Sequence, residues 1–179
     1  MMFVRRPPAA VLDRLLAEAR SATPMFSEAP GYRHDLDEVR LGNDEGVFDR
    51  AVSAVRSWQA QLGAGVEVYP TQNSVVDGDT VLLLIHAAGL WTVAPCRVVS
   101  VDDGPDRFAF AYATLPGHPE QGEATFAVRR GADGVVFRVE SASRPVGLLP
   151  RLVRPLTRRI QRRVTLEYLA AIERAAHVA

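Results

Sequence analysis

Three stretches of this chain repeat their hydrophobic positions with a helical period. Residues 8–20 and 45–62 each gather apolar side chains on one stripe, which predicts two amphipathic helices. The final stretch repeats every four residues and predicts a long C-terminal helix, regular from Pro155 onward because Pro150 and Pro155 disturb its first turns. The apolar stripe of this last helix consists of Leu148, Leu152, Leu156, Ile160, Val164, Tyr168 and Ile172, widened by Leu149, Val153 and Leu169.

A period of two, typical of half-buried strands, marks most of the remaining chain. Residues 34–41 alternate before the second helix and predict a first strand. Further strands are predicted at residues 66–69, 80–88, 91–101, 107–114, 124–130 and 135–142. Turns rich in Gly and Asp separate several of these strands, so we expect an antiparallel sheet built largely from hairpins.

One strand, a helix, a series of hairpin strands and a long C-terminal helix is the element order of the helix-grip fold of START-like and pollen-allergen proteins. The resemblance implies an α+β fold in which a curved antiparallel sheet of about seven strands wraps around the last helix and leaves a cavity. A chain of 179 residues has the length of one ordinary domain. We therefore interpret residues 1–32 as an N-terminal helix and loop extension, and residues 33–179 as the helix-grip core.

Several local motifs resemble a known family over nearly the whole chain. The motifs are Leu41-Gly42, Phe48-Asp49-Arg50-Ala51, Trp58, Pro95-Cys96-Arg97-Val98-Val99, residues 112–123 with the run Thr114-Leu115-Pro116-Gly117-His118-Pro119, Ser143-Arg144-Pro145 and Gln161-Arg162-Arg163. They are similar to the domain of unknown function 1990 family, found in bacteria and plants. The resemblance supports the fold and supplies no catalytic residues, because the family has no known function.

The predicted fold suggests a small-molecule or lipid-binding module that holds an apolar or amphipathic ligand between the sheet and the C-terminal helix. Aromatic side chains share strand faces, and the wide apolar stripe of the last helix would face them. The residues expected to line this cavity are Trp91, Phe108, Phe110, Tyr112, Phe126, Phe137, Ile160, Val164 and Tyr168.

The loop around the Pro-Gly motif is the main candidate for chemistry. His118, Glu120 and Glu123 lie within six residues of one another, so a carboxylate could orient the imidazole as an acid or base. With Arg144 as a ligand clamp, they would form a cyclase- or hydrolase-like enzyme. The alternative is a tight turn whose histidine is satisfied by backbone groups, with Arg144 in a structural ion pair. One His and two Glu at this spacing match no metal-ligand pattern, so neither metal nor cofactor is predicted.

A block of arginines accompanies the C-terminal helix. It consists of Arg144, Arg151, Arg154, Arg158, Arg159, Arg162 and Arg163. The block could dock an acidic partner or phosphate groups, which would make the protein an interaction scaffold, or it could be a solvated face paired with acids such as Glu38, Asp49 or Glu67. The chain carries 21 basic and 21 acidic residues, and no aromatic residue is interleaved with the block, so nucleic acid is not a predicted partner.

The single cysteine and the absence of long apolar runs bear on location. Cys96 lies in the apolar stretch 93–101, which favours a buried, unreactive thiol and excludes an intramolecular disulfide framework. No segment approaches the roughly 20 apolar residues of a membrane-spanning helix, and no apolar stretch follows Arg5 and Arg6 as in a secretion signal. We therefore expect a soluble, cytoplasmic protein; the pattern leaves its ligand and its oligomeric state open.

Overall fold

The computed structural model describes residues 1–26, 31–146 and 154–178, with the backbone alone for residues 145 and 154–161. In chain order the elements are β1 (Met2–Phe3), α1 (Ala9–Ser21), β2 (Arg33–Gly42), α2 (Val47–Arg56), α3 (Gln59–Gly63), β3 (Val66–Tyr69), β4 (Thr80–Ala87), β5 (Leu90–Gly104), β6 (Arg107–Thr114), β7 (Glu120–Gly131), β8 (Gly134–Pro145) and α5 (Arg154–His177). The strands form one antiparallel sheet in the order β2-β8-β7-β6-β5-β4-β3, and β1 pairs with β5.

Hairpins link the strands from β4 to β8, and their turns follow from local sequence. Between β4 and β5, Ala88 and Gly89 both have positive φ angles, 51° and 76°, as a two-residue turn between twisted strands requires. Pro105 and Asp106 turn β5 into β6, and Gly134 has a φ of 105° where β7 turns into β8. Strand β2 then pairs with β8 from Arg33↔Ser143 to Gly42↔Val135, so the first long strand completes the edge of the sheet.

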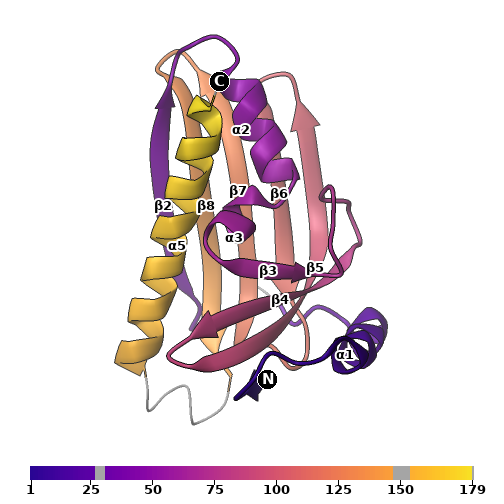
Figure 1. The fold of residues 1–179 in the computed structure, drawn as a ribbon. Coiled ribbons are helices and arrows are strands. Elements are labelled where there is room, and N and C mark those ends of the chain that lie inside the picture. Colours follow the sequence, from indigo (N-terminus) through magenta and orange to yellow (C-terminus); the bar gives the residue numbers. More distant parts are fainter. Residues whose placement is uncertain (27–30, 147–153, 179) are drawn as a thin grey trace.

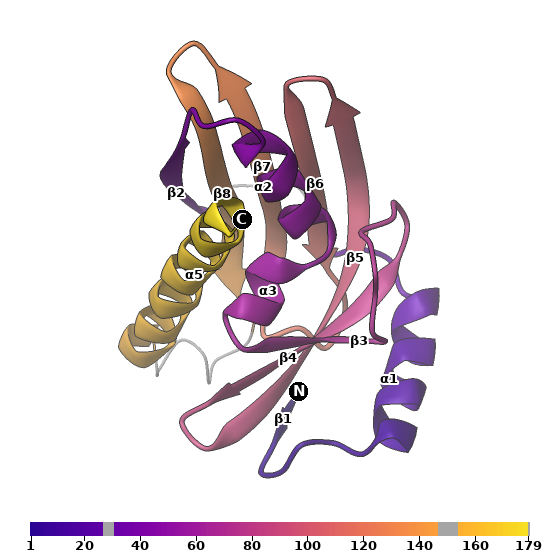
Figure 2. The ribbon, with the colours of Figure 1, turned by 45° about the horizontal axis from the view of Figure 1, so that its top comes forward.

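The sheet is curved, and helices cover its two faces separately. Helices α2, α3 and α5 lie over what we call the inner face, across β2, β8, β7 and β6 (Figure 1). Strands β3 and β4 run across the direction of these strands, and α1 lies beyond β4 on the other side, the outer face (Figure 2). The predicted curved antiparallel sheet with a C-terminal helix on it is confirmed.

The main hydrophobic core lies between the inner face and the three helices α2, α3 and α5. The sheet contributes Phe108, Phe110, Phe126 and Phe137, which are at most 1% exposed, and α5 contributes Ile172, which is 0% exposed. The alternation of each strand sends these side chains to one face, while the spacing of α5 brings its own apolar stripe against them. This core holds the C-terminal half of α5 in place.

A second core lies on the outer face beneath α1. Leu12, Leu15 and Leu16 of α1 pack against Leu82, Leu84 and Val93 of the sheet and against Leu115, which follows β6. The strands β4 and β5 are therefore apolar on both sides, which explains the nearly continuous hydrophobic run of residues 80–88. The predicted first helix is confirmed, and its function in the fold is to cover this face.

The helix predicted over residues 45–62 is wrong in one respect, because the chain breaks it in two. Trp58 has a φ of 62° between α2 and α3, a left-handed conformation that is unusual for a large side chain. In this position its indole ring is 1% exposed and lies 5.2 Å from the ring of Phe110. Tertiary packing of the indole therefore overrides the helical pattern.

The last hairpin is longer than predicted. Strand β7 begins at Glu120 and β8 ends at Pro145, whereas the sequence pattern indicated strands over residues 124–130 and 135–142. Cross-strand pairing from Glu120↔Pro145 to Gly131↔Gly134 stabilises these additional residues, although their own alternation is weak. Glu123 and Arg144 are therefore strand residues, and the loop before β7 consists of residues 115–119.

Candidate ligand-binding site

The register of the sheet arranges the inner-face side chains in transverse rows across β6, β7, β8 and β2. The first row is Phe108, Val128, Phe137 and Val39, and the second is Phe110, Phe126, Val139 and Asp37. The third row is Tyr112, Ala124, Ser141 and Asp35, and a fourth contains Gly122, Ser143 and Arg33. The inner face thus changes from large and apolar to small and polar along the strands.

The small residues of the third row are not covered as the first rows are. Phe110 and Phe126 in the second row are buried, at 1% and 0% exposure. One row further, Ala124 and Ser141 on the central strands β7 and β8 keep intermediate exposure. A small side chain in the middle of a sheet leaves space that a neighbouring helix must fill or leave open.

The structure brings most of the predicted lining residues together. Phe108, Phe110, Tyr112, Phe126, Phe137 and Tyr168 belong to the main core, and Val164 packs against it. Phe126 is central to an aromatic group, with ring centroids 5.1 Å from Phe110 and 5.5 Å from both Tyr112 and Tyr168. The side chain of Ile160 lies outside the described residues.

Trp91 does not join this group. It packs against the outer core beneath α1, and its ring stacks on that of His86 at 4.8 Å. It lies on β5 opposite His86 in the β4–β5 hairpin. The aromatic pair covers the β4–β5 end of the outer core.

A group of polar side chains lies inside the main core, and we call it the interior polar cluster: Trp58, Gln61, Cys96, Tyr112 and Tyr168. Trp58 is 1% exposed and Gln61 0%, yet the indole Nε1 of Trp58 and both amide atoms of Gln61, Nε2 and Oε1, have no hydrogen-bond partner among the described residues. Leaving a buried polar group unpaired costs about 1–3 kcal/mol. Such groups are almost always paired in native proteins, so these atoms indicate a missing partner.

The ionisable members of the interior polar cluster are held neutral. Burial raises the pKa of the Tyr112 hydroxyl well above its ordinary value, and the neighbouring Tyr168 and Cys96 raise it further. The Gln61 side chain lies close enough to the hydroxyl to lower this pKa, although the two groups do not form a hydrogen bond of normal geometry. Burial likewise raises the pKa values of Tyr168 and Cys96. Cys96 is 0% exposed, in agreement with the unreactive thiol expected from sequence.

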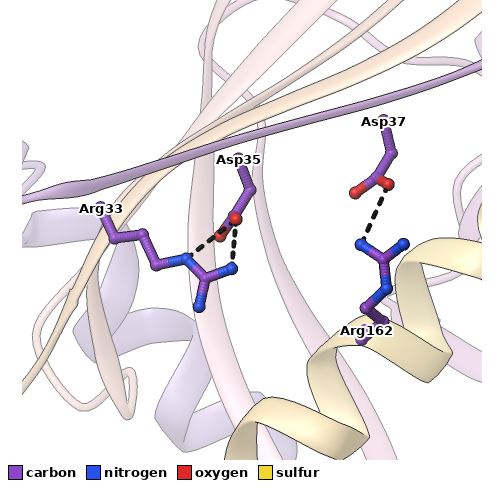
Figure 3. A network of polar contacts seen from close by, with 4 residues as sticks. All are labelled: Arg33, Asp35, Asp37 and Arg162. Carbon is purple, nitrogen blue, oxygen red and sulfur yellow. Dashed lines mark hydrogen bonds and ion pairs between the residues drawn. The ribbon is translucent and has the colours of Figure 1, made fainter.

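Charged residues lie at the polar end of the inner face. Arg33, Asp35 and Asp37 of β2 point toward α5, from which Arg162 approaches (Figure 3). Arg162 donates to Oδ1 of Asp37 at 3.3 Å, and Nε of Arg33 donates to Oδ1 of Asp35 at 2.8 Å. The Arg162–Asp37 pair connects the edge strand to α5, whereas the Arg33–Asp35 pair lies within β2 and places charge beside the small residues of the third and fourth rows.

His118 lies in the loop between β6 and β7 and is bound to its own backbone. Its Nδ1 lies 2.7 Å from the carbonyl oxygen of Glu120 and 2.9 Å from the amide nitrogen of Glu120, so either tautomer forms a local hydrogen bond. Burial lowers the pKa of His118 to about 4, opposed by the Glu120 backbone and assisted by the terminal amino group of Met1. The imidazole is therefore neutral near pH 7, with one nitrogen occupied by the loop.

Arg144 of β8 and Gln121 of β7 are cross-strand neighbours. Nε and Nη2 of Arg144 donate to Oε1 of Gln121 at 3.1 and 2.9 Å, and the guanidinium lies 5.0 Å from the ring centre of Tyr32. Gln121 in turn donates to the carbonyl of Met25. Arg144 thus fastens the segment before β2 to the sheet. Glu120 and Glu123 have interactions of their own.

The arginine block is described only in part. Arg162 and Arg163 are exposed, and Arg162 pairs with Asp37. Two of the acids expected to balance the block have other partners, since Glu38 pairs with Arg138 and Glu67 with Arg6. Arg151 and the side chains of Arg154, Arg158 and Arg159 lie outside the described residues.

Two surface hollows bounded by described residues lie at the hairpin ends. One, of about 410 Å³, lies at the β5–β6 turn beside Arg129 and Arg130, and the other, of about 380 Å³, lies beside Asn43 and Gly134. Neither is lined by a residue predicted for the ligand cavity. The cavity under α5 stays a prediction, since the side chain of Ile160 lies outside the described residues.

Metal-binding clusters and membrane-spanning helices are both absent from the described part of the chain. Within it, no three His, Cys, Asp or Glu side chains gather as a metal site would require. Among the helices described there, none combines the length and the apolar character needed to cross a membrane.

The interior polar cluster and the third row contain residues that the sequence pattern did not single out. Gln61, Ala124 and Ser141 belong to none of the motifs that the sequence analysis identified. Gln61 is buried because the chain turns at Trp58 between α2 and α3, a break that the helical pattern of residues 45–62 does not indicate.

Solved structures resemble this fold at low sequence identity. A hypothetical protein, jhp0584 from Helicobacter pylori, has a TM-score of 0.57 at 11% identity, with 84% of this chain and 90% of that chain covered. Ginseng major latex-like protein 151 from Panax ginseng has a TM-score of 0.52 at 14% identity, covering 83% and 99%. The Zhui aromatase/cyclase from Streptomyces sp. R1128 has a TM-score of 0.53 at 17% identity, covering 81% and 93%. This likeness shows the helix-grip fold.

Sequence relatives cover most of the chain. A protein of Deinococcus radiodurans described as a UPF0548 protein is 31% identical over 196 aligned residues, 98% of this chain and 99% of the relative. A UPF0548 protein of Dictyostelium discoideum is 29% identical over 148 residues, 74% of this chain and 68% of the relative. The model of the family described as domain of unknown function (DUF1990) matches residues 16–171. With its helix-grip sheet and these matches along its length, the chain belongs to the DUF1990 family.

Proposed function

We propose that this protein binds a small, mainly apolar molecule between the inner face of its sheet and α5. The observation that carries the proposal is the third row, where Ala124 and Ser141 remain partly exposed although they lie on central strands beside buried aromatic rings. Small side chains there leave room that large ones would fill. The aromatic side chains of Tyr112, Phe126 and Tyr168 supply an apolar wall for this space.

The shape of the neighbouring rows supports a ligand of mixed character. Toward the first row the face is wholly apolar, and toward the fourth it carries Ser143 and Arg33. A molecule bound across these rows would place its apolar body against the aromatic group and a polar part toward the charged edge. The similarity of the fold to a major latex-like protein and an aromatase/cyclase is compatible with such a ligand.

Filling the space tests the proposal. We expect the wild-type protein to bind the fluorescent probe 1-anilinonaphthalene-8-sulfonate, with a blue shift of its emission, and Ala124→Phe to weaken this binding at least about tenfold because the ring occupies the space. Fluorescence titration measures the affinity, and thermal unfolding shows that the variant is folded.

The matched control is Thr125→Phe. Thr125 adjoins Ala124 on β7 but points to the outer face, because it is opposite Ala111 and Glu140 in the sheet. This control should bind the probe as the wild type does. Equal binding by the wild type and both folded variants would contradict the proposed site.

A further inference from the structure

The interior polar cluster contains the strongest indication of what the ligand carries. Trp58 Nε1 is buried without a hydrogen-bond partner among the described residues, and there Gln61 Nε2 and Oε1 form no hydrogen bond of normal geometry, although the Tyr112 hydroxyl lies near the amide. Trp58 and Tyr112 belong to the same core as the proposed ligand space. An isolated unpaired atom could reflect a small local distortion. Three such atoms on two side chains three residues apart indicate a position where another polar group belongs.

The backbone conformation at Trp58 determines where its indole Nε1 and the amide of Gln61 lie. Trp58 adopts its left-handed conformation at the junction of α2 and α3, which sends the indole into the core, where its ring stacks on Tyr112 with centroids 6.5 Å apart. Gln61 follows on α3, which packs against α5. A bulky residue keeps such a conformation only when surrounding contacts enforce it, and such positions are concentrated at functional sites.

The chemistry of the interior polar cluster indicates which kind of polar group on a ligand could pair with it. The indole offers a donor, the amide offers a donor and an acceptor, and the cluster contains no Asp, Glu, Arg or His. An anion or cation would be buried there without a counter-charge, which is strongly unfavourable. A neutral hydroxyl or carbonyl group can use both the donors and the acceptor.

The surrounding rings select the body of the ligand. Phe110, Tyr112 and Phe126 form a continuous aromatic surface beside Trp58, with centroid separations between 5.1 and 6.5 Å. Aromatic rings pack well against flat aromatic molecules. We infer that Trp58 and Gln61 recognise the hydroxyl or carbonyl group of a neutral aromatic ligand; this inference rests on the proposed function.

A pair of probes that differ in one polar group tests the inference. We expect the wild-type protein to bind 2-naphthol at least about tenfold more tightly than 2-methylnaphthalene in equilibrium dialysis, because only 2-naphthol can pair with the cluster. Gln61→Met retains the length of the side chain without its polar atoms. It should lower 2-naphthol affinity about tenfold and change 2-methylnaphthalene affinity less than about twofold.

Two controls separate recognition from damage to the fold. Gln59→Met changes an exposed glutamine of the same helix and should leave both affinities unchanged. In the absence of ligand, Gln61→Met should melt at or above the wild-type temperature, because it removes unpaired buried atoms. A lower melting temperature would overturn the inference, since it would show that Gln61 already has a partner, such as a buried water.

The outcomes distinguish this inference from the proposed function. If the wild-type protein binds both probes equally, the ligand space stands and recognition by Trp58 and Gln61 is wrong. If 2-naphthol preference survives in Gln61→Met, the inference is equally wrong. If neither probe binds, the proposed function fails and the inference fails with it.

Discussion

At the scale of single residues, His118 shows how a loop controls protonation. Its folded pKa of about 4 lies below the ordinary value of 6.5, so the unfolded chain takes up the proton first as the pH falls. This contribution to stability is therefore complete above about pH 6.5 and is lost progressively as the pH falls to about 4. We expect wild-type stability to fall by about 2 kcal/mol more than that of His118→Asn between about pH 7 and pH 5, measured by urea unfolding.

Asparagine is a suitable replacement because its short polar side chain can bond the Glu120 backbone without titrating. His34→Asn provides the control, since His34 is exposed on β2 and the variant should follow the wild-type pH profile. Parallel profiles for the wild type and His118→Asn would show that burial of His118 does not control stability in this range.

At the scale of elements, Arg97 of β5 fixes the end of α1 on the sheet. Its guanidinium donates to the carbonyls of Ala19, Arg20 and Ala22 at 3.0, 2.9 and 2.9 Å, and its Nε donates to Oγ1 of Thr80 at 3.1 Å. The last carbonyls of a helix lack intrahelical partners, and a cation there also opposes the helix dipole favourably. We expect Arg97→Met to lower the free energy of unfolding by about 1–3 kcal/mol, as measured by urea denaturation.

The comparison variant is Arg107→Met. Arg107 pairs with Asp102 at 3.1 Å, but both side chains are largely exposed, so its loss should change stability by less than about 0.5 kcal/mol. If both variants were equally stable, the contacts of Arg97 would be no more important than a surface ion pair.

At the scale of the whole molecule, charge is balanced and distributed over exposed pairs. The 21 basic and 21 acidic residues include the surface pairs Arg56–Asp103, Arg130–Asp106 and Arg138–Glu38. A neutral molecule lacks the broad basic surface of nucleic-acid-binding proteins. We therefore predict no submicromolar binding of labelled duplex DNA or single-stranded RNA at about 150 mM salt in a fluorescence anisotropy titration.

A double variant of two exposed arginines of α5 shows whether any observed nucleic-acid binding comes from the arginine block. Arg162→Glu combined with Arg163→Glu would abolish binding if the arginine block were a nucleic-acid site. Submicromolar binding that this double variant removes would turn the block from a solvated surface into a functional one, and the prediction would be wrong.

Local patterns in the sequence determined the elements and their order. The four-residue repeat of Tyr168 and Ile172 and the alternation of residues 107–114 each arise from one element meeting one apolar surface, so they can be read without knowing the partner. Hairpin turns between neighbouring strands are equally local. The helix-grip arrangement therefore followed from element order, and the Pro-Gly motif pointed to the DUF1990 family.

The tertiary structure alone decided which residues meet inside. In an unbroken helix Leu62 would continue the apolar stripe from Trp58, but the left-handed turn at Trp58 buries Gln61 and leaves Leu62 44% exposed. Strand alternation separates two faces without saying which helix covers each. Trp91 therefore packs against the outer core beneath α1, whereas the sequence predicts it in the lining of the cavity under the C-terminal helix. The third row became visible only through the register of four strands, because cross-strand pairing joins residues far apart in sequence whose individual identities, Ala124 and Ser141, carry no signal.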